Sequence, residues 1–376
     1  MKSISLYIHI PFCKQKCRYC DFPSYSGKEA LMREYLNKLS MELSGEALKY
    51  SYNTVFIGGG TPSYLNEENL EYLLREMSKL SFNQNAEFTV ECNPGTLTID
   101  KLKIMKKYGV NRLSFGLQSA GDSILKNLGR IHTFEEFKSN YIAARNIGFD
   151  NINVDVMFGL PNQSLNGLQD TLRQVAELEP EHISAYSLIV EEGTVFYNLE
   201  EKGQLSLPPE DEEREMYEYC TDFLSSKGYT QYEISNFAKE GKECRHNKVY
   251  WDLDEYLGCG ASAASFIDGK RIKNFESIEA YIEAMEEKKN AAEEILILRD
   301  EDLMEEFMFL GLRKTKGISE EEFKRRFKVE IDCVYKDVIN YHIKEDLLIR
   351  EKGKIYLSKK GIQLSNYVMK DFLLDK

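Results

Sequence analysis

Two periodicities alternate through the first half of the chain, one typical of strands and one typical of helices. Short runs of β-branched and aromatic residues predict buried strands, and the longer stretches between them carry apolar residues at helical spacing. The predicted strands are Ser3–Ile10, Asn53–Ile57, Glu87–Glu91, Arg112–Leu117, Asn151–Phe158 and His182–Leu188. The predicted helices are Glu29–Leu48, Glu67–Leu80, Ile99–Tyr108, Phe134–Ile147, Leu165–Leu178 and Glu210–Ser226. Six β/α units in succession predict an α/β fold in which parallel strands form a partial (β/α)6 barrel, open on one side.

The pattern changes at about Tyr229. Gly- and aromatic-rich sequence predicts strands and turns, a β extension of the barrel, followed by an acidic helix over Ser277–Lys289. The remainder is predicted to hold three helices, a two-stranded wing and a last helix, the pattern of a small α+β winged helix. We therefore predict a barrel domain over residues 1–228, a β extension with its connecting helix over 229–299, and a winged-helix-like domain over 300–376.

Charge and hydropathy narrow the choice of partners and compartment. The chain of 376 residues has 49 basic and 62 acidic side chains, and its net charge of -13 opposes binding to nucleic acid or to an anionic membrane. Residues 300–376 hold 16 acidic and 16 basic side chains, so the winged helix lacks a basic face and a lid or packing role is favoured. Without a signal peptide or a long apolar stretch, we expect a cytoplasmic protein with no transmembrane segment.

Three of the eight cysteines fall within eight positions, directly after the first predicted strand: Cys13, Cys17 and Cys20. In a reducing cytoplasm, clustered cysteines usually bind metal, whereas the five scattered ones are expected to be structural. Three thiolates can serve a four-iron cluster and leave one iron open to a substrate. A structural zinc site would need a fourth ligand, and Asp21 is too close in sequence to supply it easily.

Polar or glycine-rich positions also follow the other strands, where the carboxyl ends of parallel strands meet on one face of a barrel. The run GGGTP begins at Gly58 after the second strand, Glu91 ends the third, and Gln118 follows the fourth. Asp155 lies inside the apolar fifth strand, where an acid is costly to bury unless something pairs with it. The glycines alone would also fit a tight turn, and Arg130 would also fit a surface residue that caps a helix.

The CxxxCxxC spacing after a strand, in a partial β/α barrel, resembles the radical S-adenosylmethionine superfamily. That resemblance implies a [4Fe–4S] cluster on Cys13, Cys17 and Cys20, with S-adenosylmethionine on the open iron and reductive cleavage of its sulfonium. It also implies that the glycines let the methionine amino group approach closely and that Arg130 pairs with its carboxylate. The S-adenosylmethionine residues that it implies are Gly59, Gly60, Thr61, Glu91, Gln118, Arg130 and Asp155, and a narrower resemblance, to one family within this superfamily, adds Tyr7 and Tyr19.

A narrower resemblance covers nearly the whole chain. The strings YIHIPFCKQKCRYCDF, GGGTP, ECNPG, SFGLQS, LGRIH and NVDVMFGLP are similar to those of the oxygen-independent coproporphyrinogen III oxidase family. Two departures favour the heme-chaperone branch of that family. Phe22 stands where the oxidases carry another cysteine, and Cys13 follows the N-terminus without the extension that the oxidases have.

The string HNKVYW, which begins at His246, resembles the HNxxYW motif of the same branch. His246 is one of five histidines and can serve as an axial heme ligand, and Tyr250 and Trp251 can pack on a porphyrin face. In isolation the motif would also fit a turn histidine beside two core aromatic residues. His9, in the first predicted strand, is either a pocket residue or a core histidine.

Three functions compete on these grounds. The favoured one is a chaperone that binds heme and uses the cluster and S-adenosylmethionine to support heme insertion into respiratory hemoproteins, through a partner at the inner face of the cytoplasmic membrane. The alternative is oxidative decarboxylation of coproporphyrinogen III to protoporphyrinogen IX; we expect cleavage of S-adenosylmethionine but not this activity. A DNA-binding regulator with a redox-sensing cluster is disfavoured by the neutral winged helix.

Overall fold

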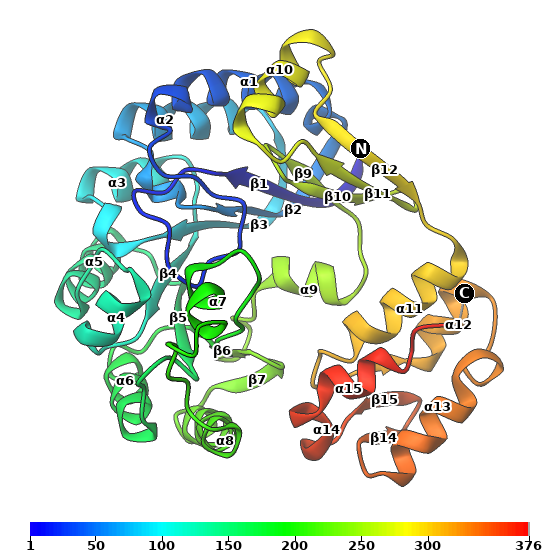
Figure 1. Cartoon of the computed structure of the whole chain (residues 1–376). Coiled ribbons are helices and arrows are strands. Elements are labelled where there is room, and N and C mark those ends of the chain that lie inside the picture. The colour runs from blue at the N-terminus through cyan, green and yellow to red at the C-terminus, as the bar shows by residue number, and fades with distance from the viewer. Residues whose placement is uncertain (375–376) are drawn as a thin grey trace.

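The computed structural model describes residues 1–374, and its largest feature is a mixed sheet curved into a partial barrel (Figure 1). Within those residues the sheet has twelve strands, in the order β12-β11-β10-β9-β1-β2-β3-β4-β5-β6-β8-β7. The six predicted strands are confirmed and run parallel to one another: β1 (Lys2–Ile10), β2 (Tyr50–Gly59), β3 (Ser81–Cys92), β4 (Arg112–Gln118), β5 (Ile152–Phe158) and β6 (His182–Ser187). Their carboxyl ends therefore share one rim of the barrel.

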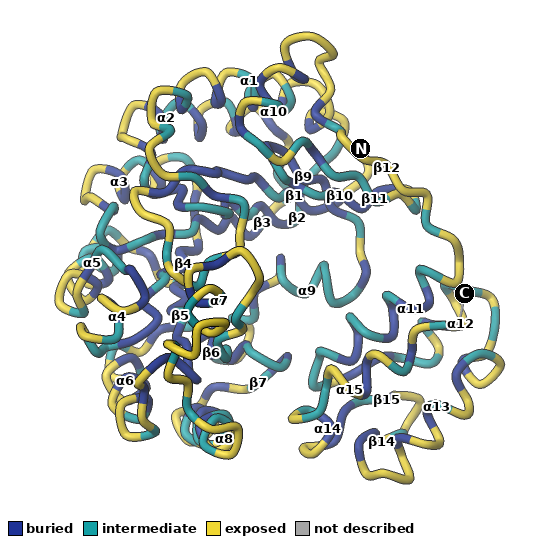
Figure 2. Tube along the Cα trace, viewed as in Figure 1, coloured by how far each residue is buried: buried dark blue, intermediate teal, exposed yellow. Residues whose placement is uncertain are grey.

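Helices cover the outer face of these strands, and the buried core lies between the two layers (Figures 1 and 2). The six predicted helices are confirmed as α1 (Met32–Gly45), α2 (Glu67–Met77), α3 (Ile99–Lys107), α5 (Phe134–Ile147), α6 (Leu165–Glu177) and α8 (Glu210–Ser226). Side-chain caps begin several of them, because Thr98 accepts from the N–H of Lys101 and Ser164 from that of Gly167. Such caps satisfy backbone donors that the first helical turn leaves unpaired.

Two short helices on the same rim are not predicted from the sequence, α4 (Asp122–Leu128) and α7 (Val195–Glu200). They have 7 and 6 residues, about two turns each. An apolar period needs a longer window than this before it stands out from the loops on either side. Both helices therefore depend on packing against the barrel rather than on a local pattern.

The segment after residue 228 divides between the two ends of the sheet. β7 (Thr230–Glu233) and β8 (Asn236–Ala238) extend the sheet beyond β6. At the other end, beyond β1, lie β9 (Tyr256–Cys259), β10 (Ala264–Ile267), β11 (Lys270–Asn274) and β12 (Ala292–Ile297). The predicted acidic helix is present as α10 (Ile278–Glu287). The predicted β extension thus consists of two separate additions that flank the six-stranded barrel.

Between these additions lies a helix, α9 (Arg245–Trp251), where the sequence indicates strands and turns; that expectation is wrong for these residues. Figure 1 shows α9 between the barrel and the C-terminal elements. Glu87 of β3 accepts hydrogen bonds from the backbone N–H groups of Arg245 and His246, at 3.0 Å each. A carboxylate on a distant strand therefore caps the start of α9, and no local sequence pattern reveals such a cap.

The C-terminal elements build a second core around an antiparallel sheet of order β13-β15-β14, as the winged-helix prediction requires. Lys314 of this unit pairs with Asp252, and the Arg313 guanidinium lies 4.5 Å from the centre of the Trp251 ring, so the unit packs on the end of α9. Its elements are α11 (Asp300–Gly311), β13 (Ile318–Ser319), α12 (Glu320–Phe327), α13 (Asp332–Lys344), β14 (Leu348–Glu351), β15 (Lys354–Leu357), α14 (Lys359–Gln363) and α15 (Ser365–Lys370). Among the helices of residues 1–374, none combines the length and apolar character that a membrane span requires.

Candidate functional site

Most residues predicted for the cluster and for S-adenosylmethionine line one cavity at the carboxyl rim of the barrel. They come from different elements, since the cysteine loop follows β1, the glycine loop ends β2, and the remaining residues lie on β3, β4, β5 and β6 or in the segments that follow them. Parallel strands bring such positions together because their carboxyl ends meet at one rim. The lining includes Cys13, Cys17, Tyr19, Cys20, Phe22, Gly59, Gly60, Thr61, Glu91, Ser114, Gly116, Gln118, Arg130, Asp155 and Tyr186.

The three cysteines are free thiols, of which Cys13 is buried and Cys17 and Cys20 are half-buried. Cys13 Sγ lies 3.4 Å from Thr61 Oγ1, and Arg130 Nη1 donates to Cys17 Sγ at 3.5 Å. Burial raises the pKa of Cys13 and raises the pKa of Cys20 to about 11, so a metal must displace their protons when it binds.

The donor set fits an iron–sulfur cluster better than a single metal ion. Nowhere in residues 1–374 do three Cys, His, Asp or Glu side chains form a group that could hold one metal ion. A [4Fe–4S] cluster takes one thiolate on each of three irons, so its thiolates lie farther apart than the ligands of a single zinc ion. Cys13, Cys17 and Cys20 beside a polar cavity therefore fit a cluster whose fourth iron faces a ligand.

The glycine loop approaches the cysteine loop too closely for side chains. Gly59 has a φ of 108°, and a Cβ atom there would lie 2.5 Å from the His9 ring. At Gly60, a Cβ atom would lie 2.9 Å from the carbonyl oxygen of Phe12 and 3.1 Å from Cys13 Sγ. Glycine is the residue that fits both positions without displacing these neighbours, and it leaves the backbone beside the cysteines bare for a ligand.

His9 and Tyr7 lie behind this loop. His9 is 4% exposed, and its Nε2 lies 2.8 Å from the carbonyl oxygen of Pro23, while its Nδ1 lies 3.0 Å from the Tyr7 hydroxyl. Of the two sequence interpretations, the structure supports a core histidine, which here holds the end of the cysteine loop. Tyr7, predicted for the S-adenosylmethionine pocket, is not among the residues that line the cavity.

Two buried carboxyl groups line the cavity. Burial raises the pKa of Glu91 to about 8, and the neighbouring Asp155 adds to this effect. Burial likewise raises the pKa of Asp155, although Asn153 Nδ2 donates to its Oδ1 at 2.7 Å. Glu91 Oε2 accepts from the N–H of Gly59 at 3.2 Å. Each of these buried carboxyl groups accepts few hydrogen bonds from the protein. They therefore fit a ligand that brings an amino group and hydroxyls, as S-adenosylmethionine does.

We expect the ligand-free protein to lose stability as the pH rises from about 4.5 to about 8, because Glu91 is protonated in the folded state over that range and ionised in the unfolded chain. A raised carboxyl pKa favours the neutral form, so the loss begins above the unfolded pKa and is complete above the folded one. It should be on the order of 4 kcal/mol. Urea unfolding at several pH values would show a flatter profile for Glu91→Gln, and equal profiles would contradict the assignment.

Arg130 lies in the cavity and not on the surface. Its Nη2 donates to the carbonyl oxygen of Gly116, and its Nε is buried without a hydrogen-bond partner in the part of the chain that the structure describes. Gln118 ends β4 with a φ of 74°, and the Tyr186 hydroxyl donates to its Oε1 at 3.1 Å. Tyr186 is a site residue that the sequence interpretation misses. It lies on β6 near the same rim, so the strand-end argument that identifies Gln118 would also have found it.

The three residues predicted for heme are not brought to one cavity. His246 is 1% exposed, with its Nδ1 2.8 Å from the Thr54 hydroxyl and its Nε2 2.9 Å from the Tyr250 hydroxyl. Trp251 lines a different hollow, between α9 and the C-terminal unit. Asn247 of the same motif lines a cavity inside the barrel.

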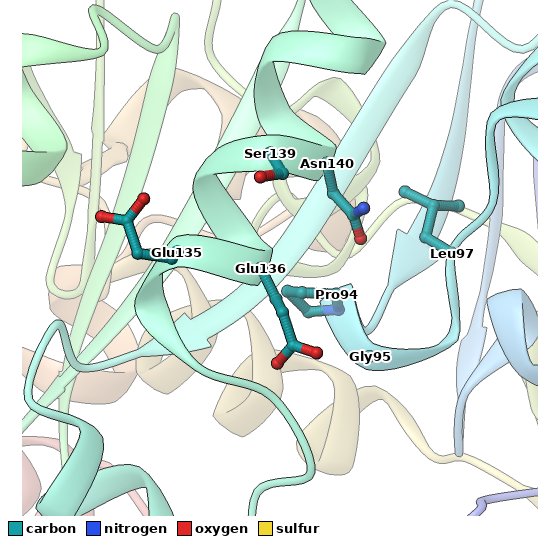
Figure 3. Close-up of a pocket in the computed structure, with 7 residues that line it drawn as sticks. All are labelled: Pro94, Gly95, Leu97, Glu135, Glu136, Ser139 and Asn140. Atoms are coloured by element: carbon teal, nitrogen blue, oxygen red, sulfur yellow. The ribbon is translucent and has the colours of Figure 1, made fainter.

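A further hollow on the outside of the barrel shares no lining residue with the cysteine cavity (Figure 3). It lies between the loop after β3 and the first turns of α5. The Glu136 side chain accepts from the N–H of Thr133 and so completes the cap of α5. The role of Glu136 in this hollow is thus to cap α5. The lining residues are Pro94, Gly95, Leu97, Glu135, Glu136, Ser139 and Asn140.

Known proteins match both parts of the chain. The model of the radical SAM superfamily matches residues 7–175, and that of the HemN C-terminal domain matches residues 298–364. The solved structure of coproporphyrinogen III oxidase (HemN) from Escherichia coli superposes with a TM-score of 0.87 over 99% of this chain and 90% of that one. At 23% identity, that likeness shows the fold alone.

Curated relatives cover the whole length. The chain is 42% identical to the protein named heme chaperone HemW from Bacillus subtilis (strain 168), over 98% of this chain and 99% of the relative. It is 38% identical to the protein of the same name from Lactococcus lactis subsp. lactis (strain IL1403), over 100% of this chain and 98% of the relative. By this identity over nearly its whole length, the chain belongs to the HemW family within the radical SAM superfamily.

Proposed function

We propose that this protein is a heme chaperone, which binds heme and uses a [4Fe–4S] cluster and S-adenosylmethionine to support heme insertion into recipient hemoproteins. The observation that carries the proposal is its identity, over nearly the full length, to relatives that bear this name. Respiratory hemoproteins are the proposed recipients. The protein would meet them in the cytoplasm or, through a partner, at the inner face of the cytoplasmic membrane.

The residues at the rim have separate tasks in this proposal. Cys13, Cys17 and Cys20 hold the cluster, which when bound to S-adenosylmethionine supplies one-electron reductive chemistry. Gly59 and Gly60 admit the methionine end of the ligand, because no Cβ atom blocks the backbone there. The acids bind the remaining polar groups of the ligand: Glu91 accepts from its amino group and Asp155 from its ribose hydroxyls. Arg130 pairs with its carboxylate.

Heme is proposed to bind at the motif on α9, with His246 as axial ligand. Burial lowers the pKa of His246 to about 3, and the nearby Arg112 cation adds to this effect, so the imidazole is neutral as iron coordination requires. Both of its ring nitrogens lie within hydrogen-bond distance of hydroxyl groups. Coordination through Nε2 must therefore release the Tyr250 hydroxyl and open this end of α9.

We expect His246→Ala to weaken heme binding strongly and Tyr250→Phe to strengthen it by about 2- to 10-fold, because Tyr250→Phe removes one hydrogen bond that competes for Nε2. Heme titrations followed by absorbance and stoichiometry would measure both changes. His342→Ala is the matched control, since it removes a buried histidine from the C-terminal unit, away from α9. If His246→Ala and His342→Ala bind heme with equal spectra and affinity, His246 is not the ligand.

The oxidase alternative has a direct test. Phe22, which stands where the oxidases carry a fourth cysteine, is 61% exposed and lies at the cavity beside Cys20. An anaerobic assay with the reconstituted protein and coproporphyrinogen III should therefore show no loss of the two carboxylates. Turnover to protoporphyrinogen IX would reject the chaperone proposal in favour of the enzyme.

A further inference from the structure

A second cavity of about 460 Å³ continues from the cysteine cavity into the barrel. The two share lining residues, among them Tyr19, Glu91, Asp155 and Tyr186. Alternate residues of a strand face the same side, so Arg112, Ser114 and Gly116 of β4 all point inward. Ser114 and Gly116 are small, and they leave space between the rim and Arg112.

Arg112 is the charged group at the inner end of this space. It is 1% exposed, and its Nε and Nη1 are buried without a partner. Within residues 1–374 its guanidinium makes no hydrogen bond or ion pair. An arginine cannot lose its charge, and a buried charge without a partner is costly, so its retention here calls for a ligand.

The acids near Arg112 form their hydrogen bonds with groups other than its guanidinium. Glu87 accepts from the N–H groups of Arg245 and His246 at the start of α9, and Asp155 accepts from Asn153. Burial by itself would lower the pKa of Arg112, but the surrounding Cys244, Glu87, Tyr232 and Asp155 raise it, so the guanidinium stays charged. Its fork of N–H donors is therefore available to an anion that enters from the rim.

The rest of the cavity indicates what kind of molecule carries that anion. Leu188 and Ile189 line it beyond the end of β6, and Ile189 is 66% exposed. Phe56 lines it from β2 and stacks on the His246 ring, with the ring centres 5.3 Å apart. The wall thus combines apolar side chains with polar ones, among them the acids Asp21 and Glu191. Such a wall suits a ligand that has an apolar body, polar edges and an anionic arm for Arg112.

We infer that Arg112 binds the carboxylate arm of a ligand that enters the barrel from the cysteine rim. The inference rests on the proposed function, which supplies heme and its propionates as one source of the carboxylate. The carboxylate of S-adenosylmethionine is the other source, bound at Arg112 in place of Arg130. In either case Arg112 binds the ligand and does not stabilise the fold.

The test uses heme and its dimethyl ester, in which both propionates are esterified. The full-length protein should bind heme about 10- to 100-fold more tightly than the ester, because a charge-assisted hydrogen bond is lost. Arg112→Gln should bind the two equally, and Arg112→Lys should keep part of the difference. In the second arm, calorimetry compares the binding of S-adenosylmethionine to the cluster-reconstituted parent protein and to Arg112→Gln. If the substitution weakens this binding and leaves the discrimination against the ester unchanged, the carboxylate is that of S-adenosylmethionine.

Stability separates binding from folding. Arg112→Gln should unfold at the same urea concentration as the parent protein, or at a higher one, because it removes a buried charge that has no partner. Arg145→Gln is the control, because Arg145 is paired with Glu181 at 2.8 Å. This variant should unfold at a lower urea concentration than the parent protein, since the substitution breaks that pair. The inference is overturned if Arg112→Gln still discriminates against the ester and binds S-adenosylmethionine normally. If the parent protein binds no heme, the chaperone proposal fails, while the S-adenosylmethionine arm still tests Arg112.

Discussion

Cys17→Ser is expected to abolish the iron–sulfur cluster, with bound iron falling by more than about 10-fold after anaerobic reconstitution with iron and sulfide. Cys17 is half-buried and accepts a hydrogen bond from Arg130, so its side chain already faces the cavity. A serine hydroxyl is a poor ligand for iron in such a cluster and cannot replace the thiolate. Iron and sulfide content, together with the visible absorption of the cluster, would measure the loss.

Cys333→Ser provides the matched control. Cys333 is exposed on the C-terminal unit, at the start of α13, and does not line the cavity. The substitution is chemically identical and should leave the iron content unchanged. Equal iron in the two variants would show that Cys17 is not a cluster ligand. Any remaining cluster would then have to be assigned to other cysteines.

Gly59→Ala is expected to lower the free energy of unfolding by about 2 to 5 kcal/mol. The alanine must adopt the left-handed φ of 108°, which costs about 1 to 2 kcal/mol. Its Cβ would also lie 2.5 Å from the His9 ring, and crowding of this kind costs about 1 to 3 kcal/mol more. His9 holds the end of the cysteine loop through Pro23, so the binding of S-adenosylmethionine should weaken as well.

Gly109→Ala separates the two costs. Gly109 also has a positive φ, of 86°, but a Cβ atom there would meet nothing within 4 Å. The free energy of unfolding of this variant should fall by only about 1 to 2 kcal/mol, the cost of the left-handed backbone. Its binding of S-adenosylmethionine should be normal. Urea unfolding and calorimetry on reconstituted protein would compare the pair. If Gly59→Ala and Gly109→Ala lose equal stability, the contact with His9 has no energetic importance.

Local patterns predict much of this fold because most of its elements are long enough to show a period. The strand β4 (Arg112–Gln118) and the helix α8 (Glu210–Ser226) lie within a residue of their predicted ends. Thr98 and Ser164 cap the helices that follow them, as expected of residues whose side chains bond to the backbone nearby. Each of these signals involves residues only a few positions apart, so the sequence alone is enough to predict the element.

Local sequence patterns do not predict contacts between segments that are distant in the chain. The helix α9 (Arg245–Trp251) is capped by Glu87, 158 positions away from Arg245. Its residues therefore resemble strands and turns when they are read alone. His246 shows the same limit, because the sequence identifies a heme-type motif but cannot reveal that Thr54 and Tyr250 flank the imidazole.

The sequence by itself determined the order of β/α units, the close spacing of Cys13, Cys17 and Cys20, and the strand ends that meet at one rim, since each follows from neighbours along the chain. Tertiary structure alone decided which buried groups lack partners. Arg112 shows the physical reason. Glu87 could have formed an ion pair with it, but the Glu87 carboxylate instead accepts hydrogen bonds from the first N–H groups of α9. Whether a buried charge is paired depends on which segments meet in space, and that is settled only when the barrel closes.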